Sequence, residues 1–404
     1  AICIIMAIWL TFLLLIHGAI GLRTTPLIML HDAKFQAQST RQENSMFYSA
    51  PKQFGNEIKL TASEQDNSDF FYRDHFGEMQ DGQIPIICDP QQYNIQFFGL
   101  ENFHPLDTKK FSKVLETLIT EGMVEKGQCV KPKAISYDLL RLIHSESYLK
   151  SLQSSITVAE LSELFFVAFM PRFIVEKYIL KPMLFHVGGT VLAGKLALKN
   201  GWSINLGGGM HHAHSDGGGG WCLYSDIVLS YQYLRNYFPD EVKKVLVVDL
   251  DVHQGNGVAR DKLKMNDVNT FIFDMYRKNI YPLDYKAQKG IDYEIQLRGN
   301  EQDKEYLELL EKGLRASFAS SDPDIVYFNA GTDTLTGDPL GGMNLSPDAI
   351  VARDEMVFRF CIDRNIPIVM VLSGGYTKPL SSQTIAKSIL NLEKKFGLTK
   401  NQLK

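Results

Sequence analysis

Short apolar runs separated by stretches of helical periodicity dominate the chain from Ile84 onward. The runs are continuously apolar, which is typical of strands buried on both faces of a parallel sheet. They predict strands at 203–206, 245–250, 270–273, 325–329 and 366–372, and the segments between them predict helices at 226–238, 304–318 and 346–364. The last helix is expected to open with Ser346 as N-cap and Pro347 as its first residue. This alternation predicts one large α/β domain over residues 84–395, with a mainly parallel sheet flanked by helices.

The ends of the chain lack this pattern. Residues 1–22 contain no Asp, Glu, Lys or Arg and match the roughly 20 apolar residues of a membrane-crossing helix. A secretory signal peptide is less favoured, because its apolar part is shorter and follows a basic start. An atypical anchor and an artefact of the gene model both stay open. Residues 23–83 are polar and without sustained periodicity, which predicts a poorly ordered extension, and residues 396–404 are expected to form a tail.

Composition narrows the class of protein. Hydrophobic residues make up 45% and charged residues 22% of the 404 positions, as in ordinary folded proteins. The formal net charge is -4, so no global positive field exists to hold a polyanion, and we expect no direct nucleic-acid binding. The 5 cysteines are scattered, which fits neither a disulfide framework nor a CxxC zinc module and indicates a reduced, intracellular enzyme.

A pair of histidines follows the predicted strand at 203–206. Ligands of open parallel sheets bind beyond the carboxyl ends of the strands, so the loops that follow strands are the expected place for a site. His211 and His212 are flanked on both sides by glycines. Such a backbone turns sharply and lets a substrate approach closely. A single loop histidine is more often a surface residue, but an adjacent pair in this setting favours catalysis.

The strand at 245–250 predicts a metal site. Asp249, Asp251 and His253 alternate with apolar residues and therefore point to the same side. Carboxylates that converge in this way repel one another unless a cation joins them, which favours a divalent metal over an ordinary acidic turn. Asp251 and His253 are then the expected ligands, and Asp249 is expected to accept a hydrogen bond from a nearby imidazole.

Two later loops supply further candidates. A catalytic metal site keeps three protein ligands, and Asp333, just past the strand at 325–329, is the expected third. Asp338 competes for this role, but its Gly-Asp-Pro sequence is typical of a turn-forming aspartate. Tyr376 follows a Gly-Gly turn after the last strand, where its phenol can donate to a developing oxyanion; a packed aromatic is the alternative interpretation.

Taken in order, the histidine pair and the segments 249–257, 331–334 and 374–376 resemble the motifs of the zinc-dependent histone deacetylases. The resemblance covers residues 84–392, and its details are most similar to class IV, the histone deacetylase 11 type. It implies an arginase/deacetylase-like α/β fold and hydrolysis of an acyl group from a lysine side-chain amide. The resemblance also implies residue roles. Asp251, His253 and Asp333 are expected to hold one zinc ion, His212 to act as the general base, and Tyr376 to donate to the oxyanion. His211, oriented by Asp249, is expected to act as the electrostatic partner or as a proton relay.

Two positions depart from the commonest pattern of that family. Many relatives have Asp beside the second imidazole, whereas this chain has Asn256 and the class IV pattern also has Asn. An amide cannot supply the same negative charge, so the two histidines should differ in pKa. Trp221 stands where Phe is common on the wall of the substrate tunnel, with Gly220 and Gly375 as further expected substrate contacts. The larger indole is expected to change acyl preference, and the class IV resemblance favours long fatty acyl groups over acetyl.

The resemblance leaves rival functions open. An acetylpolyamine or other small-molecule amidohydrolase on the same fold would share every candidate residue. An arginase-like dimetal hydrolase is less favoured, because it would need more Asp ligands in the segment 249–256. A non-catalytic scaffold that binds acyl-lysine is disfavoured by the complete set of candidates. The expected partners are acyl-lysine proteins such as histones, together with corepressor proteins. The family also commonly holds a structural K+ ion on backbone carbonyls around residues 249–253, and it resides in nucleus and cytoplasm, with membrane association only if residues 1–22 are an anchor.

Overall fold

Eight strands form one parallel sheet in the computed structural model, which describes residues 77–96, 99, 101 and 105–399. Their order is β2-β1-β3-β8-β7-β4-β5-β6, and every neighbouring pair is parallel. The strands are β1 (Ile84–Ile87), β2 (Cys129–Val130), β3 (Trp202–Asn205), β4 (Val245–Asp249), β5 (Thr270–Arg277), β6 (Tyr293–Leu297), β7 (Ile325–Asn329) and β8 (Ile368–Val371). Parallel neighbours need crossover connections, and helices supply them here.

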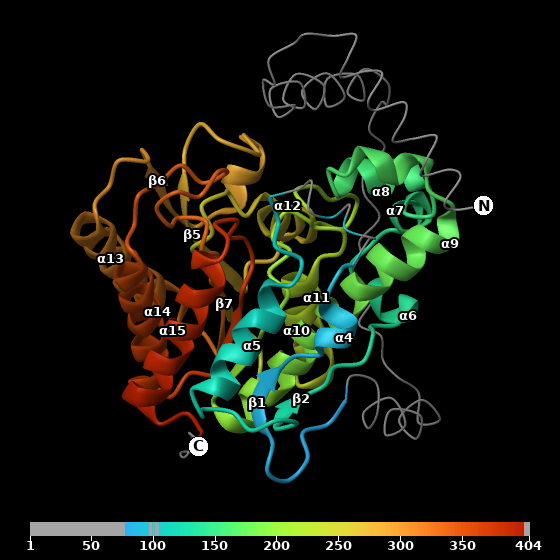
Figure 1. Cartoon of the computed structure of the whole chain (residues 1–404). Coiled ribbons are helices and arrows are strands. Elements are labelled where there is room, and N and C mark those ends of the chain that lie inside the picture. The colour runs from blue at the N-terminus through green and yellow to red at the C-terminus, as the bar shows by residue number, and fades with distance from the viewer. Residues whose placement is uncertain (1–76, 97–98, 100, 102–104, 400–404) are drawn as a thin grey trace, which may run out of the picture. The chain divides into compact units, whose positions relative to one another are not determined.

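Helices cover both faces of this sheet (Figure 1). The described α-helices are α4 (Pro90–Tyr93), α5 (Lys110–Thr120), α6 (Tyr137–Leu140), α7 (Glu146–Ser151), α8 (Ser155–Leu161), α9 (Arg172–Val175), α10 (Lys181–Asn200), α11 (Asp226–Tyr237), α12 (Asn256–Met265), α13 (Asp303–Ser321), α14 (Pro347–Ile362) and α15 (Leu380–Phe396). The described chain also has two 3-10 turns, η2 (Phe165–Phe169) and η4 (Ala287–Gly290). One π-helical turn, η3 (Glu176–Leu180), connects α9 to α10.

Successive residues of the strands point into two separate cores. In β4, Val245 and Val247 pack with α10 and α11, whereas Leu246 and Val248 pack with α13, α14 and α15 on the opposite face. All residues of β4 and of β7 are buried. Burial on both faces explains why these strands are continuously apolar in sequence.

The predicted fold class is confirmed: the described chain is an α/β domain with a parallel sheet flanked by helices. Each predicted strand and helix is present, with ends displaced by a few residues, as where β5 continues to Arg277. The strands β1, β2 and β6 had not been predicted. Two of these strands escape for clear reasons, because β2 has only two residues and β6 lies at the sheet edge with one buried residue.

The helix α10 was also missed, because glycines interrupt its apolar sequence. A Cβ atom on Gly188 would lie 2.0 Å from the carbonyl oxygen of Lys133, and one on Gly189 would lie 2.0 Å from the Tyr93 hydroxyl. Close packing therefore requires glycine at these positions even though glycine lowers helix propensity. Tertiary contacts decided the structure of this segment.

Four neighbouring strands end at the same edge of the sheet and carry the candidate residues. The strands β3, β8, β7 and β4 are adjacent in the sheet and run in one direction. The loops that follow them hold, respectively, the histidine pair, Tyr376, Asp333 and the segment from Asp251 to His253. The sheet thus brings together segments that are far apart in the sequence.

The predicted hydrophobic segment 1–22 lies outside the described residues, as does most of the predicted extension 23–83. Between Gly77 and Thr399, no helix has both the length and the apolar character needed to cross a membrane. The boundaries at residues 84 and 395 stay predictions; β1 begins at Ile84 and α15 ends at Phe396.

Replacing Ser346 should measurably destabilise the fold. Its hydroxyl accepts a hydrogen bond from Ala349 N at 3.1 Å as the N-cap of α14 and donates one to Asp303 Oδ2 at 2.5 Å, at the start of α13. We expect Ser346→Ala to lower the free energy of unfolding by about 1–2 kcal/mol in urea titrations. Ser346→Thr keeps the hydroxyl and should lose much less. Equal stability of the alanine variant and the parent would contradict the role of this cap.

Candidate active site

A buried aspartate holds the loop that carries the histidine pair. Asp226, the first residue of α11, accepts hydrogen bonds from Gly209 N and Met210 N, both at 2.8 Å, and from Thr190 Oγ1 at 2.6 Å. Gly208 has a φ of +72°, in the left-handed region that favours glycine. The sequence reasoning missed Asp226, whose only signal was its position in the first turn of a predicted helix.

His211 is oriented by an aspartate from the end of β4. Its Nδ1 lies 2.9 Å from Asp249 Oδ2, and Asp249 Oδ1 accepts a hydrogen bond from Asn329 Nδ2 at 2.8 Å. Burial alone would lower the pKa of His211, but the carboxylates of Asp249 and Asp251 outweigh it and raise the pKa to about 9. His211 is therefore the cationic member of the pair.

His212 has a different environment. Its Nδ1 lies 2.8 Å from Asn256 Oδ1, which is a neutral partner. Burial, followed by the charges of His211 and His253, lowers the pKa of His212 well below the ordinary value. The two rings lie 4.1 Å apart between centroids. The pair thus combines a charged imidazole with a neutral one that is able to accept a proton.

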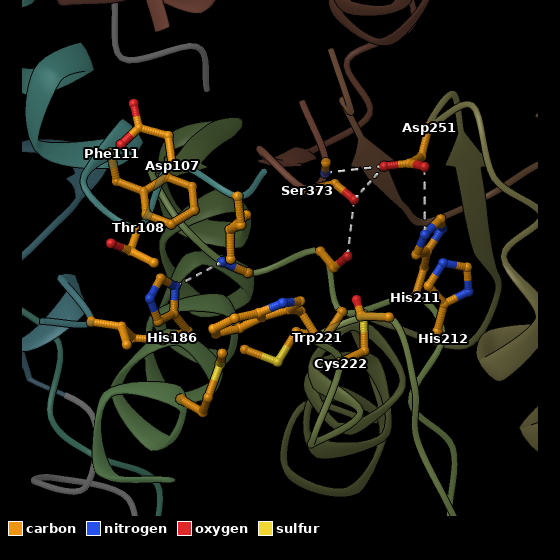
Figure 2. A pocket seen from close by; sticks show the side chains of 18 of the residues that line it. Asp107, Thr108, Phe111, His186, His211, His212, Trp221, Cys222, Asp251 and Ser373 are labelled. Carbon is orange, nitrogen blue, oxygen red and sulfur yellow. Dashed lines mark hydrogen bonds and ion pairs between the residues drawn. The ribbon is translucent and has the colours of Figure 1, made fainter. Parts of the chain in front are cut away.

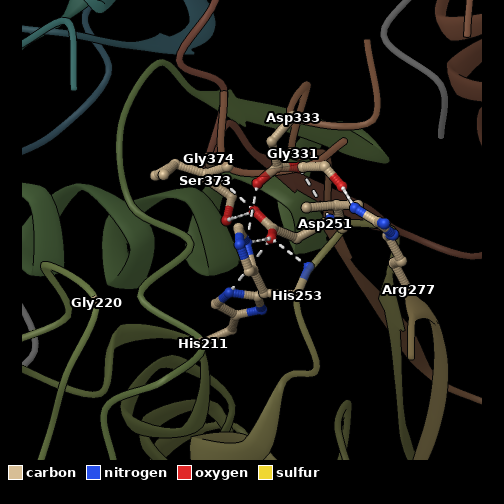
Figure 3. A network of polar contacts seen from close by, with 12 residues as sticks. His211, Gly220, Asp251, His253, Arg277, Gly331, Asp333, Ser373 and Gly374 are labelled. Carbon is tan, nitrogen blue, oxygen red and sulfur yellow. Dashed lines mark hydrogen bonds and ion pairs between the residues drawn. The ribbon is translucent and has the colours of Figure 1, made fainter. Parts of the chain in front are cut away.

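Three buried side chains converge where the sequence predicts a metal. Asp251, His253 and Asp333 offer ligand atoms that all lie within 4.8 Å of one another (Figure 3). His253 Nδ1 lies 3.0 Å from Asp251 Oδ1 and 3.2 Å from Asp333 Oδ2. Asp333 Oδ2 is buried and makes no hydrogen bond to the described residues. The geometry therefore brings the three predicted ligands together.

The electrostatics of these three residues fit a bound cation. Burial and the neighbouring carboxylate of Asp251 raise the pKa of Asp333 to about 7. The carboxylates in turn overcome the effect of burial on His253 and raise its pKa to about 10. The pocket thus favours positive charge, and two carboxylates with one imidazole are a ligand set that suits zinc with an open coordination position.

The loop after β8 closes over the metal ligands. Ser373 Oγ and Gly374 N donate to Asp251 Oδ2 at 2.9 and 3.0 Å. Tyr376 N donates to Asp338 Oδ2 at 2.7 Å, so Asp338 supports this loop instead of joining the metal ligands. Burial raises the pKa of the Tyr376 phenol well above its ordinary value, which keeps it protonated and able to donate.

A cavity connects the histidine pair to the interior. Figure 2 shows His211, His212 and Asp251 at one end and His186 and Phe111 at the other. Residues from the predicted site that line it, besides these, are Gly220, Trp221 and Tyr376. Gly374 also lines the cavity, whereas a Cβ on the predicted contact Gly375 would lie 2.1 Å from Thr332 Oγ1, in packed protein.

Two residues that contact the site carried no signal in the sequence. Tyr281 places its ring edge-on to His212, with centroids 4.9 Å apart. Lys110 Nζ, from the first residue of α5, donates to the carbonyl oxygens of Ser373 and Gly374 at 2.6 and 2.9 Å. Burial lowers the pKa of Lys110 to about 8. Both lie far in sequence from the residues that they support, so only the fold reveals them.

Comparison with known proteins agrees with this geometry. The family model described as the histone deacetylase domain matches residues 104–392. "Histone deacetylase 2" of Arabidopsis thaliana is 44% identical over 312 residues, which cover 77% of this chain and 79% of that protein. "Histone deacetylase 8" of Xenopus tropicalis is 26% identical over 314 residues, which cover 74% and 82% respectively.

A solved structure resembles the described fold. The crystal structure of the "HDA15 HD domain" aligns with a TM-score of 0.60 at 19% identity and covers 79% of this chain and 90% of that chain. At this identity the likeness concerns the fold alone. It places the sheet and its helices in the deacetylase-like class that the motifs imply.

A methyl group on Gly374 should impair metal binding. A Cβ at this position would lie 2.3 Å from Asp333 Oδ2 and 2.6 Å from Asp251 Oδ2. We expect Gly374→Ala to lower zinc affinity by about tenfold or more, measured by competition with a chelating dye. Gly122→Ala, where no atom lies within 4 Å of the added Cβ, should retain the parent affinity. Unchanged zinc affinity in a folded Gly374→Ala protein would contradict the proposed ligand set.

Proposed function

The chain belongs to the histone deacetylase family, and from this premise we propose that it hydrolyses N6-acyl-lysine in proteins with one zinc ion per chain. The observation that carries the proposal is the convergence of Asp251, His253 and Asp333 beside the histidine pair, in one cavity. Family membership makes the protein an enzyme, a hydrolase that acts on linear amide C–N bonds.

The proposed zinc site uses the three converging ligands. Zinc, when bound there, polarises an amide carbonyl and makes a water molecule more acidic. The Oδ2 of Asp333 supports the assignment, because it is buried and makes no hydrogen bond to the described residues, while its neighbour His253 Nδ1, at 3.2 Å, is itself a proposed ligand. Ser373 and Gly374 hold Asp251 in place and thereby fix the orientation of a ligand.

His212 is the proposed general base. It is neutral at physiological pH, since its pKa lies well below the ordinary value through burial, so it can take a proton from the attacking water and return it to the leaving lysine amine. His211 is positively charged through Asp249 and serves as the electrostatic partner of the developing negative charge. The unequal charges of the pair thus separate the two roles.

Tyr376 is the proposed oxyanion donor. Tyr376 lines the same cavity as His211 and His212, and its backbone N–H donates a hydrogen bond to the carboxylate of Asp338. A protonated phenol stabilises the tetrahedral oxyanion by a hydrogen bond that strengthens as the negative charge develops. The raised pKa of Tyr376, caused first by burial, supports this role.

The proposal extends to class IV and to long fatty acyl substrates. The neutral partner Asn256 beside His212 and the Trp221 wall support both parts. The cavity continues past Trp221 to an end lined by the apolar Phe111 and Met183 together with the polar Asp107, Thr108 and His186, and the apolar side chains there suit an alkyl chain. Acetylpolyamines are the rival substrates, and they lack the long apolar group that this end would bury.

A K+ ion behind the zinc site is also part of the proposal. Asp274 Oδ1 is buried and makes no hydrogen bond to the described residues. Burial and then the charge of Asp249 raise the pKa of Asp274 well above its ordinary value, so a cation at this place would relieve the repulsion.

Acyl-lysine proteins such as histones are the proposed substrates, with corepressor proteins as partners and residence in nucleus and cytoplasm. The formal net charge of -4 supports action on proteins without direct nucleic-acid binding. Membrane association through residues 1–22 stays a prediction.

Assays of the full chain test the function directly. We expect zinc-loaded protein to deacylate lysine peptides, to lose activity with a chelator and to regain it with zinc. Myristoyl-lysine should exceed acetyl-lysine, and acetylspermidine should be the poorest substrate. His212→Ala should lower kcat by about 10²–10⁴ because it removes the base, whereas His214→Ala on the same loop should not. Activity that survives both chelation and His212→Ala would refute the proposal.

The Tyr376 hydroxyl should contribute to kcat and little to KM. Tyr376→Phe removes one oxyanion donor and keeps the ring, so kcat should fall by about 10²–10³. Tyr327→Phe is the matched control, because its buried hydroxyl bonds to Ser230 at 2.7 Å, away from the cavity. Equal turnover by Tyr376→Phe and its parent would remove the oxyanion role.

A further inference from the structure

The side-chain nitrogen of Asn256 donates a hydrogen bond to a buried carboxylate. Asp284, in the loop between β5 and η4, is buried, and its Oδ2 accepts a hydrogen bond from Asn256 Nδ2 at 3.2 Å. Arg260 Nε donates to the same oxygen. Ala287 N donates to Oδ1 at 3.1 Å. Both carboxylate oxygens therefore have fixed partners, and only one of these partners reaches the histidine pair.

The backbone of Asp284 is clamped as well. Gln254 Oε1 accepts from Asp284 N, and Gln254 Nε2 donates to Asp284 O, both at 3.2 Å. Gln254 directly follows the predicted metal ligand His253 in sequence. The position of Asp284 is thus tied to the same segment that carries Asn256. These two hydrogen bonds fix the loop of Asp284 relative to the site.

The carboxylate determines which way the Asn256 amide faces. An ionised carboxylate only accepts hydrogen bonds, so the amide nitrogen of Asn256 must point toward Asp284. Burial raises the pKa of Asp284, but the hydrogen bond and charge of Arg260 outweigh it and hold the pKa below its ordinary value, so the group is ionised. The amide oxygen then faces His212 Nδ1, at 2.8 Å.

The amide orientation in turn determines the tautomer of His212. A carbonyl oxygen only accepts, so the hydrogen of the neutral imidazole must reside on Nδ1. The lone pair is then on Nε2, where a general base needs it. A flipped amide would present its nitrogen to Nδ1 and force the hydrogen onto Nε2, which would leave the ring unable to take a proton from water.

We propose that Asp284 is a positioning residue that sets the tautomer of His212 through Asn256. This inference rests on the proposed function only for its effect on turnover, since the tautomer itself is a property of the protein. The relay runs from Arg260 to Asp284, then to Asn256 and His212. It orients the imidazole of His212 through a neutral amide and keeps the carboxylate one residue away from the ring.

The relay also explains why residue 256 is an amide. A carboxylate at this position would lie close to Asp284 Oδ2, where Nδ2 now lies at 3.2 Å, and the two like charges would repel. Asn256→Asp should therefore impair the enzyme unless Asp284 loses its charge at the same time.

Turnover of zinc-loaded full chain on myristoyl-lysine and acetyl-lysine peptides tests the relay. We expect Asp284→Leu to lower kcat by about 10–100-fold with little change in KM. Asn256→Asp should also lower kcat, because its carboxylate would repel that of Asp284. The control Asp267→Asn removes a comparable aspartate, which pairs with Arg235 at 2.5 Å, and should leave kcat unchanged.

The tautomer is read separately by ¹⁵N NMR of histidine-labelled protein, with His212→Ala to assign the signals. The parent should show a protonated Nδ1 and an unprotonated Nε2 for His212, and Asp284→Leu should lose this single pattern. A hydrogen on Nε2 in the parent, or an unchanged tautomer in folded Asp284→Leu, would overturn the proposal. A parent with the expected tautomer but no deacylation refutes the proposed function while supporting the relay.

Discussion

Repulsion between the buried carboxylates of Asp251 and Asp333 is the constraint on which the rest of the site depends. Both side chains are almost fully buried, and a hydrogen bond from Val252 N to Asp333 Oδ1 at 2.9 Å offsets only part of the charge. Ser373 and Gly374 donate to Asp251 from the opposite side. What remains is a negative pocket in a low dielectric, which a divalent cation can neutralise. The glycines around it have no side chains, so their backbone packs directly against the carboxylates of Asp251 and Asp333.

The histidine pair shows how small differences in partner produce different charge states. Both rings are buried and their centroids are 4.1 Å apart, yet one pKa is raised and the other is lowered. His211 faces a carboxylate directly, whereas an amide separates His212 from the charge of Asp284. Two adjacent histidines can therefore differ in charge state without any difference in residue type.

The site also depends on residues that support the backbone. Lys110 binds the carbonyl oxygens of Ser373 and Gly374, and Asp226 binds the amides of Gly209 and Met210. Glycine allows the loops after β8 and β3 to adopt many conformations. These hydrogen bonds stabilise one of them. Rigid loops of this kind suit a site that must align a substrate carbonyl with a metal and a base.

The sequence by itself determined the α/β class, the strands of the sheet centre and the candidate residues that follow them. Continuous apolar runs indicate strands that are buried on both faces of a sheet. The alternation of Asp249, Asp251 and His253 with apolar residues indicates that their side chains point to the same side of the strand. The sequence did not reveal α10, where contacts with Lys133 and Tyr93 demand glycine, nor β6, whose edge position leaves only one of its residues buried. Nor did it reveal Tyr281, Lys110 or Asp284. Only the tertiary structure shows the parts that these residues play, because each of them acts through contacts with residues distant in sequence. Hydrophobic periodicity predicts helices and strands, but it does not predict which loops the sheet brings together.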